Sequence, residues 1–418
     1  MRHALSSFVL VALAFVAGCA SPAEVERPPD ETEAPVEARA LVLVSIDGFR
    51  WDYLDRAPQD GALRFVAEGA RAERLVPVFP TKTFPNHYSL VTGLHPQAHG
   101  IVGNTMRDPS RLEDGEPARF SLSDRDAVAD GRWWGGEPIW VTAETQGVPV
   151  ATVFWPGSEA EIAGVRPTTW LAYDGDLPYL DRVDAALDGL DDGAGLVTLY
   201  FEGVDTAGHR FGPDAPEVDQ AIEDVDAALS ALVDGLRQRG RLDDTDLVVV
   251  SDHGMTAVSR DRVVVLDDAV DLDAVDVEWG EPVGLWPAEG QDVDALVARV
   301  SALPHVTAYR KERLPERLHY AASVRIPPVV LLADLGWTVT SQGYLDRSSD
   351  RPSGGTHGYD NAMPDMHGVF LARGPRFRSG ATTGPLQAVD VYGIVAAALG
   401  LDPAPNAGDP DAIGRVLR

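Results

Sequence analysis

Three continuous apolar runs constrain the fold of this sequence most, and an acidic residue follows each of them. The runs cover residues 40–46, 196–200 and 247–251. Such runs are typical of strands that are buried on both faces, as in a parallel sheet. Asp47, Asp205 and Asp252 follow the runs, and α/β folds bind ligands at the carboxyl ends of parallel strands. We therefore predict an α/β fold with a ligand site at this edge of the sheet. Asp47 alone could instead cap the next helix, but the two similar strand ends favour a metal ligand.

The rest of the sequence predicts further helices, strands and loops around these three strands. Apolar residues recur at helical spacing between Val218 and Leu236, which predicts an amphipathic helix packed on the sheet. Short strand-like runs and one helix, at 292–303, indicate a small α+β insertion over about residues 260–353. We expect a polar surface loop at 108–136 and a last helix at 386–399.

The segment from Pro80 to Ser89, PTKTFPNHYS, is a candidate site of chemistry. Pro80 and Pro85 each disfavour a helical conformation in the residue before them, so a helix becomes plausible only from about Asn86. Thr83 would then lie at or near a helix N-terminus, where free N–H groups and the helix dipole favour an anion. This position suits a hydroxyl nucleophile that attacks a phosphate. An ordinary N-cap in a turn between prolines is the alternative.

Two Asp–His pairs are candidate metal ligands. Asp205 and His209 lie four residues apart with a glycine between them, and they can face one ion if the segment makes a turn. An oxygen–nitrogen pair suits zinc, although such spacing also arises by chance. Asp252 and His253 are adjacent at a predicted strand end, where they could also form a core ion pair.

Two histidines compete for the remaining ligand position. His357 lies in Gly-Thr-His-Gly, where small neighbours let the backbone come close and present the ring. His367 directly precedes a predicted strand and is the rival.

Five motifs support a family resemblance. They are PTKTFPNHY at 80–88, VTGL at 91–94, HGIVGN at 99–104, WPGSE at 155–159 and SDHGM at 251–255. Together they resemble the nucleotide pyrophosphatase/phosphodiesterase (NPP) family of the alkaline phosphatase superfamily, and the resemblance extends from about Ala40 to about Leu401. The chain departs from the family before Asp205. Family members commonly have Glu-x-Pro-Asp here, whereas this chain has Gly203 and Val204 before the aspartate. This departure concerns the pocket wall rather than the ligands.

The resemblance implies a three-layer α/β/α sandwich of the alkaline phosphatase type and a site for two zinc ions. The ligands that it implies for one zinc are Asp205, His209 and His357, and for the other Asp47, Asp252, His253 and the Thr83 oxygen. It favours His357 over His367.

The resemblance also implies roles in substrate binding and catalysis. Thr83 would be the nucleophile, and Asn104 would hydrogen-bond a phosphate oxygen. Phe84 and Tyr173 would stack on a nucleotide base, although packing alone would also explain both rings. Tyr200 would line the substrate pocket.

The implied reaction is hydrolysis of nucleotide phosphodiester or pyrophosphate bonds, with release of a nucleoside 5′-monophosphate through a covalent threonine intermediate. A lipid-headgroup phosphodiesterase, a phosphonate hydrolase and a phosphomonoesterase could share these ligands. A choline-type substrate would need an aromatic and acidic cage. A phosphomonoester dianion would need an added cation, and no arginine stands out near Thr83 in the sequence. An inactive surface-binding protein is the alternative of another class, and the intact ligand set argues against it.

The charge of the chain restricts its partners. The formal net charge is −30, with only two lysines among 418 residues. A nucleic-acid duplex requires a basic footprint, so we expect a small-molecule substrate and no duplex partner. Local cations, metals above all, would have to reverse the field at a site for anionic substrates.

The N-terminus resembles a bacterial lipoprotein signal. Residues 1–19 join a short basic start to an apolar run that is too short to span a membrane as a mature helix, and Val-Ala-Gly-Cys resembles a lipobox that ends at Cys19. Cys19 is the only cysteine, so no intrachain disulfide is possible. An ordinary cleaved signal peptide is the alternative. Residues 20–39 are rich in Pro, Glu and Ala and predict a flexible tether. We expect an exported monomer that is lipid-anchored in the bacterial envelope, at the periplasmic face or the outer membrane, with a catalytic domain at 40–418.

Overall fold

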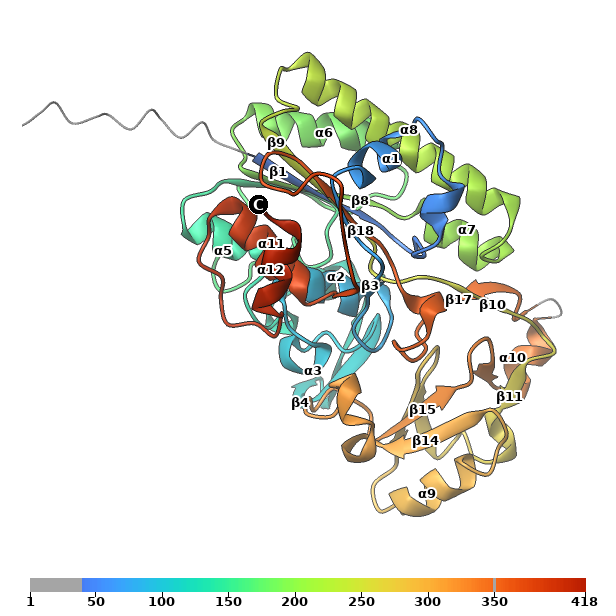
Figure 1. Cartoon of the computed structure of the whole chain (residues 1–418). Helices are drawn as coiled ribbons and strands as arrows, with labels where there is room; N and C mark the ends of the chain where they lie inside the picture. The colour runs from blue at the N-terminus through green and yellow to red at the C-terminus, as the bar shows by residue number, and fades with distance from the viewer. Residues whose placement is uncertain (1–39, 349–350) are drawn as a thin grey trace, which may run out of the picture. The chain divides into compact units, whose positions relative to one another are not determined.

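The central sheet of the protein has eight strands in the order β19-β2-β18-β9-β1-β8-β6-β7 (Figure 1). The structure is a computed structural model that describes residues 40–348 and 351–418. The predicted signal peptide, Cys19 and the tether lie outside the described residues. The strands are β1 (Ala40–Ile46), β2 (Ala70–Ala72), β6 (Val150–Val153), β7 (Thr169–Leu171), β8 (Leu196–Phe201), β9 (Thr245–Val250), β18 (Phe370–Arg373) and β19 (Ala381–Thr383).

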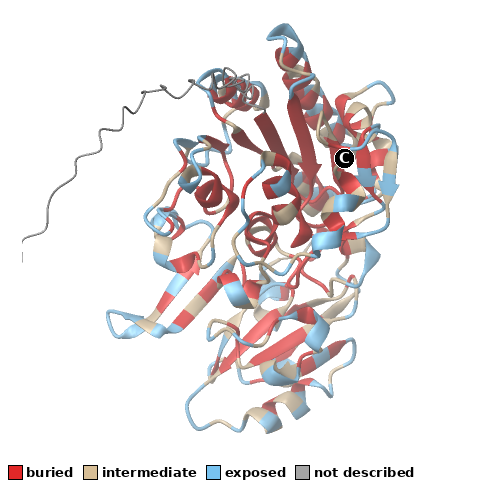
Figure 2. Ribbon diagram, turned by 60° about the vertical axis from the view of Figure 1, so that its left-hand side comes forward, coloured by how far each residue is buried: buried red, intermediate tan, exposed pale blue. Residues whose placement is uncertain are grey.

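The middle of this sheet is parallel, as the apolar runs predict. β1 pairs in parallel with β8 and β9, and β6 pairs in parallel with β8 and β7. Only β18 runs antiparallel to both of its neighbours. Every residue of β1 is buried, because its side chains alternate between two hydrophobic clusters. Figure 2 shows these strands in the buried centre of the described fold.

Helices cover both faces of the sheet (Figure 1). Those that contribute to one cluster are α1 (Ala62–Ala67), α6 (Tyr179–Asp191), α7 (Gly203–Phe211) and α8 (Pro216–Gln238). Those that contribute to the other are α2 (Thr83–Thr92), α5 (Ile139–Thr145), α11 (Asp390–Leu399) and α12 (Pro410–Val416). The predicted α/β/α sandwich is therefore confirmed, and α8 is the predicted amphipathic helix.

The predicted α+β insertion is also confirmed. A four-stranded antiparallel sheet has the order β12-β13-β15-β14 and its own hydrophobic cluster. Its elements are β12 (Val275–Glu278), β13 (Val283–Pro287), α9 (Val293–Val300), β14 (Val306–Arg310) and β15 (Val329–Ala333). α9 is shorter than the predicted 292–303, and the Asp292 side chain caps its N-terminus.

Smaller elements connect the insertion to the main sheet. β11 (Val263–Val265) pairs with β16 (Thr338–Thr340), and β10 (Thr256–Val258) pairs with β17 (Gly354–Thr356). The helix α10 (Gln342–Arg347) lies between β16 and β17 along the chain. The β10–β17 pair brings the chain back from the insertion to the edge of the main sheet where β9 ends.

The predicted surface loop at 108–136 is wrong. Its first half forms a hairpin of β4 (Thr105–Glu113) and β5 (Glu116–Ser121), and α4 (Arg125–Ala129) follows. Asp114 and Gly115 make the turn with φ of 52° and 89°. An Asp-Gly pair with both φ values positive is the signal of a type I′ hairpin. Phe120 on the hairpin is buried, which explains why this polar segment is ordered.

The last helix begins later than predicted. Leu386–Gln387 forms β20, which pairs with β3 (Leu75–Val76). The Asp390 carboxylate accepts a hydrogen bond of 2.8 Å from the Gln387 N–H, and α11 starts at Asp390. One further short helix, α3 (Pro96–His99), follows α2. In the part of the chain that the structure describes, no helix has the length and apolar character needed to cross a membrane.

Candidate active site

The carboxyl ends of β1, β8 and β9 meet at one edge of the sheet and carry most of the candidate ligands. Asp47 directly follows β1, and Asp252 and His253 follow β9. Asp205 and His209 lie in α7, directly after β8. The sequence prediction assumed a turn for this pair. The structure has a helix, in which residues four apart lie on the same face.

Asp47, Asp252 and His253 form one buried group, with one ligand atom of each within 4.8 Å of the others. His253 Nε2 lies 3.0 Å from Asp252 Oδ2 and 3.5 Å from Asp47 Oδ1. The other ring nitrogen, Nδ1, is 2.9 Å from the Gly254 carbonyl oxygen. Because a carbonyl only accepts, Nδ1 carries the proton and Nε2 presents its lone pair to the carboxylates, as a metal-binding histidine does.

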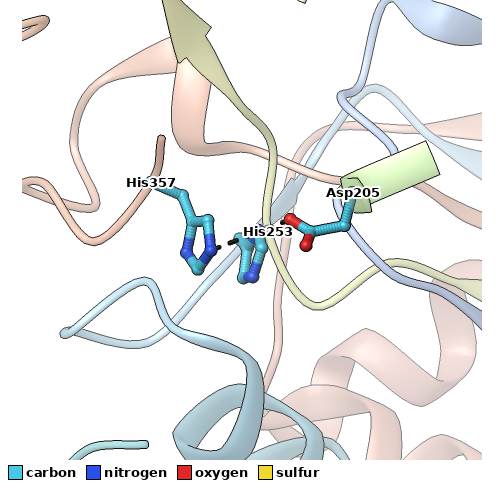
Figure 3. A group of neighbouring side chains, drawn as sticks. All are labelled: Asp205, His253 and His357. Atoms are coloured by element: carbon cyan, nitrogen blue, oxygen red, sulfur yellow. Dashed lines mark ion pairs between the residues drawn. The ribbon is translucent and has the colours of Figure 1, made fainter. Parts of the chain in front are cut away.

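A second group contains Asp205, His253 and His357 (Figure 3). The rings of His253 and His357 stack at 3.6 Å, so the two groups adjoin. His209, which the resemblance implies in place of His253, also lies here. Its Nε2 is 3.5 Å from Asp205 Oδ2 and 3.1 Å from His357 Nε2.

The hydrogen bonds of His209 and His357 leave two lone pairs facing each other. His209 Nδ1 lies 2.9 Å from the Gly355 carbonyl oxygen, and His357 Nδ1 lies 2.7 Å from that of Thr81. Both Nδ1 atoms therefore donate, and both Nε2 atoms are acceptors at 3.1 Å from each other. Two acceptors at this distance repel unless a cation lies between or beside them. His367, the rival of His357, instead lies 3.0 Å from the Asn361 carbonyl oxygen and is in neither group.

Most of the carboxylates and imidazoles of this cluster are buried together, and burial shifts the pKa values of several of them. Asp47 Oδ1 and Asp205 Oδ1 are buried without a hydrogen-bond partner among the described residues. Burial and the nearby carboxylates of Asp252 and Asp205 raise the pKa of Asp47 well above its usual value. Burial and the neighbouring rings of His253 and His209 hold the pKa of His357 well below its usual value. Carboxylate and neutral imidazole ligands without thiolates fit a divalent metal such as zinc.

Thr83 is the first residue of α2, and its hydroxyl faces the first group. Thr83 Oγ1 lies 3.4 Å from His253 Nε2. The prediction that Thr83 lies at a helix N-terminus is confirmed, but α2 begins at Thr83 and not at about Asn86. Pro85 fits in the first turn because the N–H that it lacks has no partner within the helix there. Asn104 Oδ1 accepts the Phe84 N–H at 3.0 Å, which leaves the Asn104 amide nitrogen free to donate.

His87, for which the sequence predicted no role, links α2 to the candidate ligands. It is fully buried, with Nδ1 2.9 Å from the Thr83 carbonyl oxygen and 3.3 Å from Asp252 Oδ2. Its Nε2 is 2.8 Å from the Ser45 hydroxyl on β1. The signal was its position four residues after Thr83, on the same helix face.

A cavity of about 180 Å³ opens beside Thr83. Its lining residues are Asp47, Thr83, Phe84, Leu122, Arg125, Val128, Phe154, Trp155, Pro156, Glu159, Tyr173, Tyr200 and Asp205. Phe84, Tyr173 and Tyr200 thus share one cavity, as the resemblance implies. Tyr200 also contacts the candidate ligands, because its hydroxyl donates to Asp47 Oδ2 at 2.6 Å. Asn104 is not among the lining residues, although its partner Phe84 is.

Arg125 corrects one expectation from the sequence, which was that no arginine stands out near Thr83. Arg125 lies in α4 and lines the same cavity as Thr83. Its guanidinium makes a close ion pair with the Glu159 carboxylate. The sequence analysis missed it because the segment was expected to be a surface loop.

The fold and the cluster together define a class of phosphoester hydrolase, and the family model agrees. Residues 41–360 match the family "Type I phosphodiesterase / nucleotide pyrophosphatase". The chain belongs to this family.

Several curated relatives and solved structures resemble the chain over most of its length. The human ectonucleotide pyrophosphatase/phosphodiesterase family member 5 is 36% identical over 376 residues, which are 89% of this chain and 76% of the human protein. The venom phosphodiesterase of Macrovipera lebetinus is 34% identical, over 96% of this chain but 47% of its own length. The chain thus spans about three quarters of one relative and about half of the other.

The structure of the murine family member 5 has a TM-score of 0.84 and 35% identity, over 91% of this chain and 100% of the murine chain. A second murine structure, of an inactive variant in which a threonine is replaced by alanine, is a complex with AMP, with a TM-score of 0.83 and 35% identity. It covers 90% of this chain and 100% of the murine chain.

Proposed function

We propose that the protein is a zinc-dependent hydrolase of nucleotide phosphodiester or pyrophosphate bonds that releases a nucleoside 5′-monophosphate. The observation that carries the proposal is the position of Thr83. Its hydroxyl lies at the N-terminus of α2, between a carboxylate–imidazole cluster and a cavity with aromatic walls. The AMP complex of an inactive murine relative supports a nucleotide as the substrate.

Two groups of ligands would hold two zinc ions. We assign Asp205, His209 and His357 to one ion, and Asp47, Asp252, His253 and the Thr83 oxygen to the other. The unpartnered carboxylate oxygens and the inward-facing Nε2 atoms support this assignment. When bound, such ions polarise phosphate oxygens and ease ionisation of a hydroxyl.

Several residues of the chain would each have a separate role in the reaction. Thr83 Oγ1 attacks phosphorus in line with the leaving group and forms a nucleotidyl-threonine, and water cleaves this ester in a second in-line displacement. Two such displacements retain the configuration at phosphorus. The Asn104 amide donates to a non-bridging oxygen, and the dipole of α2 favours the anionic phosphate at the helix N-terminus. Phe84 and Tyr173 hold the base by stacking.

The charges in the cavity favour a nucleotide over a cationic lipid headgroup. Glu159 and several aromatic rings would resemble a cage for a choline-type cation. However, Arg125 pairs with Glu159 in the same cavity, and the pair carries no net charge. The aromatic surface then suits a neutral planar base.

The experiment compares two substrates on the metal-replete fragment from about residue 37 onward. We expect kcat/KM for p-nitrophenyl thymidine 5′-monophosphate to be far above that for p-nitrophenyl phosphate, and a chelator to abolish both activities. A preference for the monoester would overturn the substrate proposal while leaving the metal site intact. Activity that survives the chelator would overturn the zinc proposal.

The location of the protein is a separate proposal. We propose export and lipid anchoring at Cys19, in the bacterial envelope at the periplasmic face or the outer membrane, with a monomeric catalytic domain. The lipobox-like sequence that ends at Cys19 supports it. Labelled palmitate should be incorporated by the full-length protein in bacterial cells and not by Cys19→Ala; equal labelling of both would contradict the anchor.

A further inference from the structure

Arg182, in α6, is a buried charge behind the nucleotide cavity. Its exposed fraction is 0%, and it does not line the cavity. Burying a guanidinium is costly unless its donors are paired. The partners of Arg182 therefore indicate the role of this residue.

The guanidinium bonds to three backbone carbonyls. Nε donates to the Leu177 oxygen at 3.0 Å, Nη2 to that of Gly175 at 3.4 Å, and Nη1 to that of Tyr200 at 3.1 Å. Leu177 and Gly175 belong to the segment 172–178, which we call the Tyr173 loop. Tyr200 lies on β8. Arg182 thus connects the loop that carries Tyr173 to the strand that carries Tyr200.

Glu202 holds the guanidinium in place. Its two carboxylate oxygens accept from Nη1 at 2.5 Å and from Nη2 at 3.0 Å. Glu202 comes directly after β8 and precedes α7, which carries Asp205. A planar fork with five donors can make all these contacts at once, whereas a lysine ammonium cannot.

The same side chain supports the aromatic wall from behind. The Arg182 guanidinium lies 5.0 Å from the centre of the Phe154 ring. Phe154 contacts Tyr173 edge-on at 5.4 Å, and Tyr173 contacts Tyr200 edge-on at 6.2 Å. Tyr173 itself is 41% exposed, so packing alone does not fix its ring.

We propose that Arg182 is the positioning residue of the nucleotide-binding wall. It sets the place of the Tyr173 ring by holding the Tyr173 loop against the end of β8, and it touches neither the ligand cluster nor Thr83. The inference rests on the proposed function, because it assumes that Tyr173 stacks on a base.

The test uses two diesters with the same leaving group and the same charge. One is p-nitrophenyl thymidine 5′-monophosphate, and the other is methyl p-nitrophenyl phosphate, which has no base. Arg182→Lys keeps the charge pair with Glu202 but loses the fork. Loss of one base–aromatic stack is worth about 1–3 kcal/mol, which is about 5- to 140-fold at about 1.4 kcal/mol per tenfold. We expect Tyr173→Ala to weaken binding of the nucleotide by this factor. For Arg182→Lys we expect a KM for the nucleotide at least about threefold above wild type, with kcat retained.

A double-mutant cycle separates positioning from a general loss of structure. In the Tyr173→Ala background, Arg182→Lys should have no further effect on the nucleotide, because the residue acts through that ring. Arg182→Lys should hydrolyse the methyl ester at the wild-type rate. Arg376→Lys is the matched control, since Arg376 also pairs with a buried carboxylate, that of Asp246 on β9, far from the strand ends that carry the ligands. It should leave both KM values unchanged.

Each other outcome overturns a stated part of the inference. Equal losses on both esters, or effects of Arg182→Lys and Tyr173→Ala that add, would show that Arg182 is merely structural. If Arg182→Lys fails to fold, Glu202→Gln applies the same test, with the same shift in KM expected at smaller size. If the wild type prefers the nucleotide and Arg182→Lys keeps the full preference, the inference alone is wrong. If the wild type shows no preference for the nucleotide over the methyl ester, the proposed function and the inference are both wrong.

Discussion

Replacing Tyr200 with phenylalanine removes one oxygen beside the ligand cluster and should weaken metal binding. The hydroxyl donates to Asp47 Oδ2 at 2.6 Å, whereas Asp47 Oδ1 has no hydrogen-bond partner among the described residues. One carboxylate oxygen is thus fixed and the other is left to bind a metal, as in a ligand with an outer hydrogen-bond partner. Burial and the nearby Asp47 carboxylate raise the pKa of Tyr200 well above its usual value, so the hydroxyl remains a donor at any ordinary assay pH.

The size of the effect follows from this single bond. A hydrogen bond to a charged acceptor contributes about 1.5–3 kcal/mol, which corresponds to about 10- to 140-fold in a binding constant. Loss of an outer-shell partner typically costs about 10- to 100-fold in metal affinity. The two estimates agree, so we expect Tyr200→Phe to bind zinc about 10- to 100-fold more weakly.

The assay is competition for zinc between the apoprotein and a chromophoric chelator of known affinity. At saturating zinc, kcat should return to within about threefold of wild type, because the ligands themselves are intact. Tyr53→Phe is the matched control. The Tyr53 side chain is also buried, but its hydroxyl donates to the neutral Pro213 carbonyl at 3.1 Å and lies outside both ligand groups. Unchanged zinc affinity in Tyr200→Phe, or an equal loss in Tyr53→Phe, would refute the reasoning.

Three further predictions concern Thr83 as the proposed nucleophile, Asn104 as the proposed hydrogen-bond donor to the phosphate, and the buried His99. Thr83→Ala should bind zinc and substrate but lose turnover, which a single-turnover assay measures; undiminished turnover would exclude the covalent mechanism. Asn104→Ala should lower kcat by about 10²–10³-fold, since it removes one preorganised donor, and a change confined to KM would contradict this role. His99 Nδ1 accepts the Ile101 N–H and Nε2 bonds to the Ser89 hydroxyl, and burial lowers its pKa to about 3. The unfolded state therefore binds a proton at this histidine more readily than the folded state does. As the pH falls below about 6.5, this difference should reduce the unfolding free energy by about 1.4 kcal/mol per pH unit. His99→Asn should make the dependence on pH less steep in urea titrations.

The sequence predicted the positions of most candidate ligands well, because these positions depend on regular elements. The apolar run of β1 could only be a buried strand, and its end fixed the place of Asp47. The prolines indicated a helix start close to Thr83, although α2 begins at Thr83 itself and includes Pro85 in its first turn. Parallel pairing then brings together the ends of strands from three segments that are distant in the sequence. The pattern of apolar residues can indicate this without any knowledge of long-range contacts.

The surroundings of the site were harder to predict because they depend on pairings between distant residues. Arg125 was assigned to a surface loop, yet it reaches the cavity through a hairpin whose order depends on the burial of Phe120. The sequence predicted no role for Arg182, whose partners are Glu202 and carbonyls on β8 and the Tyr173 loop. No spacing rule relates these residues.

This difference explains why the class of reaction is easier to infer than the substrate. The candidate ligands come from strand ends and helices, where the backbone is fixed by the sheet and the position of a side chain follows from its place in the element. The rings that would select a base come partly from the Tyr173 loop, which Arg182 holds through two carbonyls and the Glu159 carboxylate holds through the Tyr173 N–H at 3.2 Å. Loops held by a few contacts can change without disturbing the sheet. Substitutions at Arg182 and Glu202 should therefore shift substrate preference while the metal site stays intact, and substitutions at Asp47 or His253 should abolish hydrolysis of every ester alike.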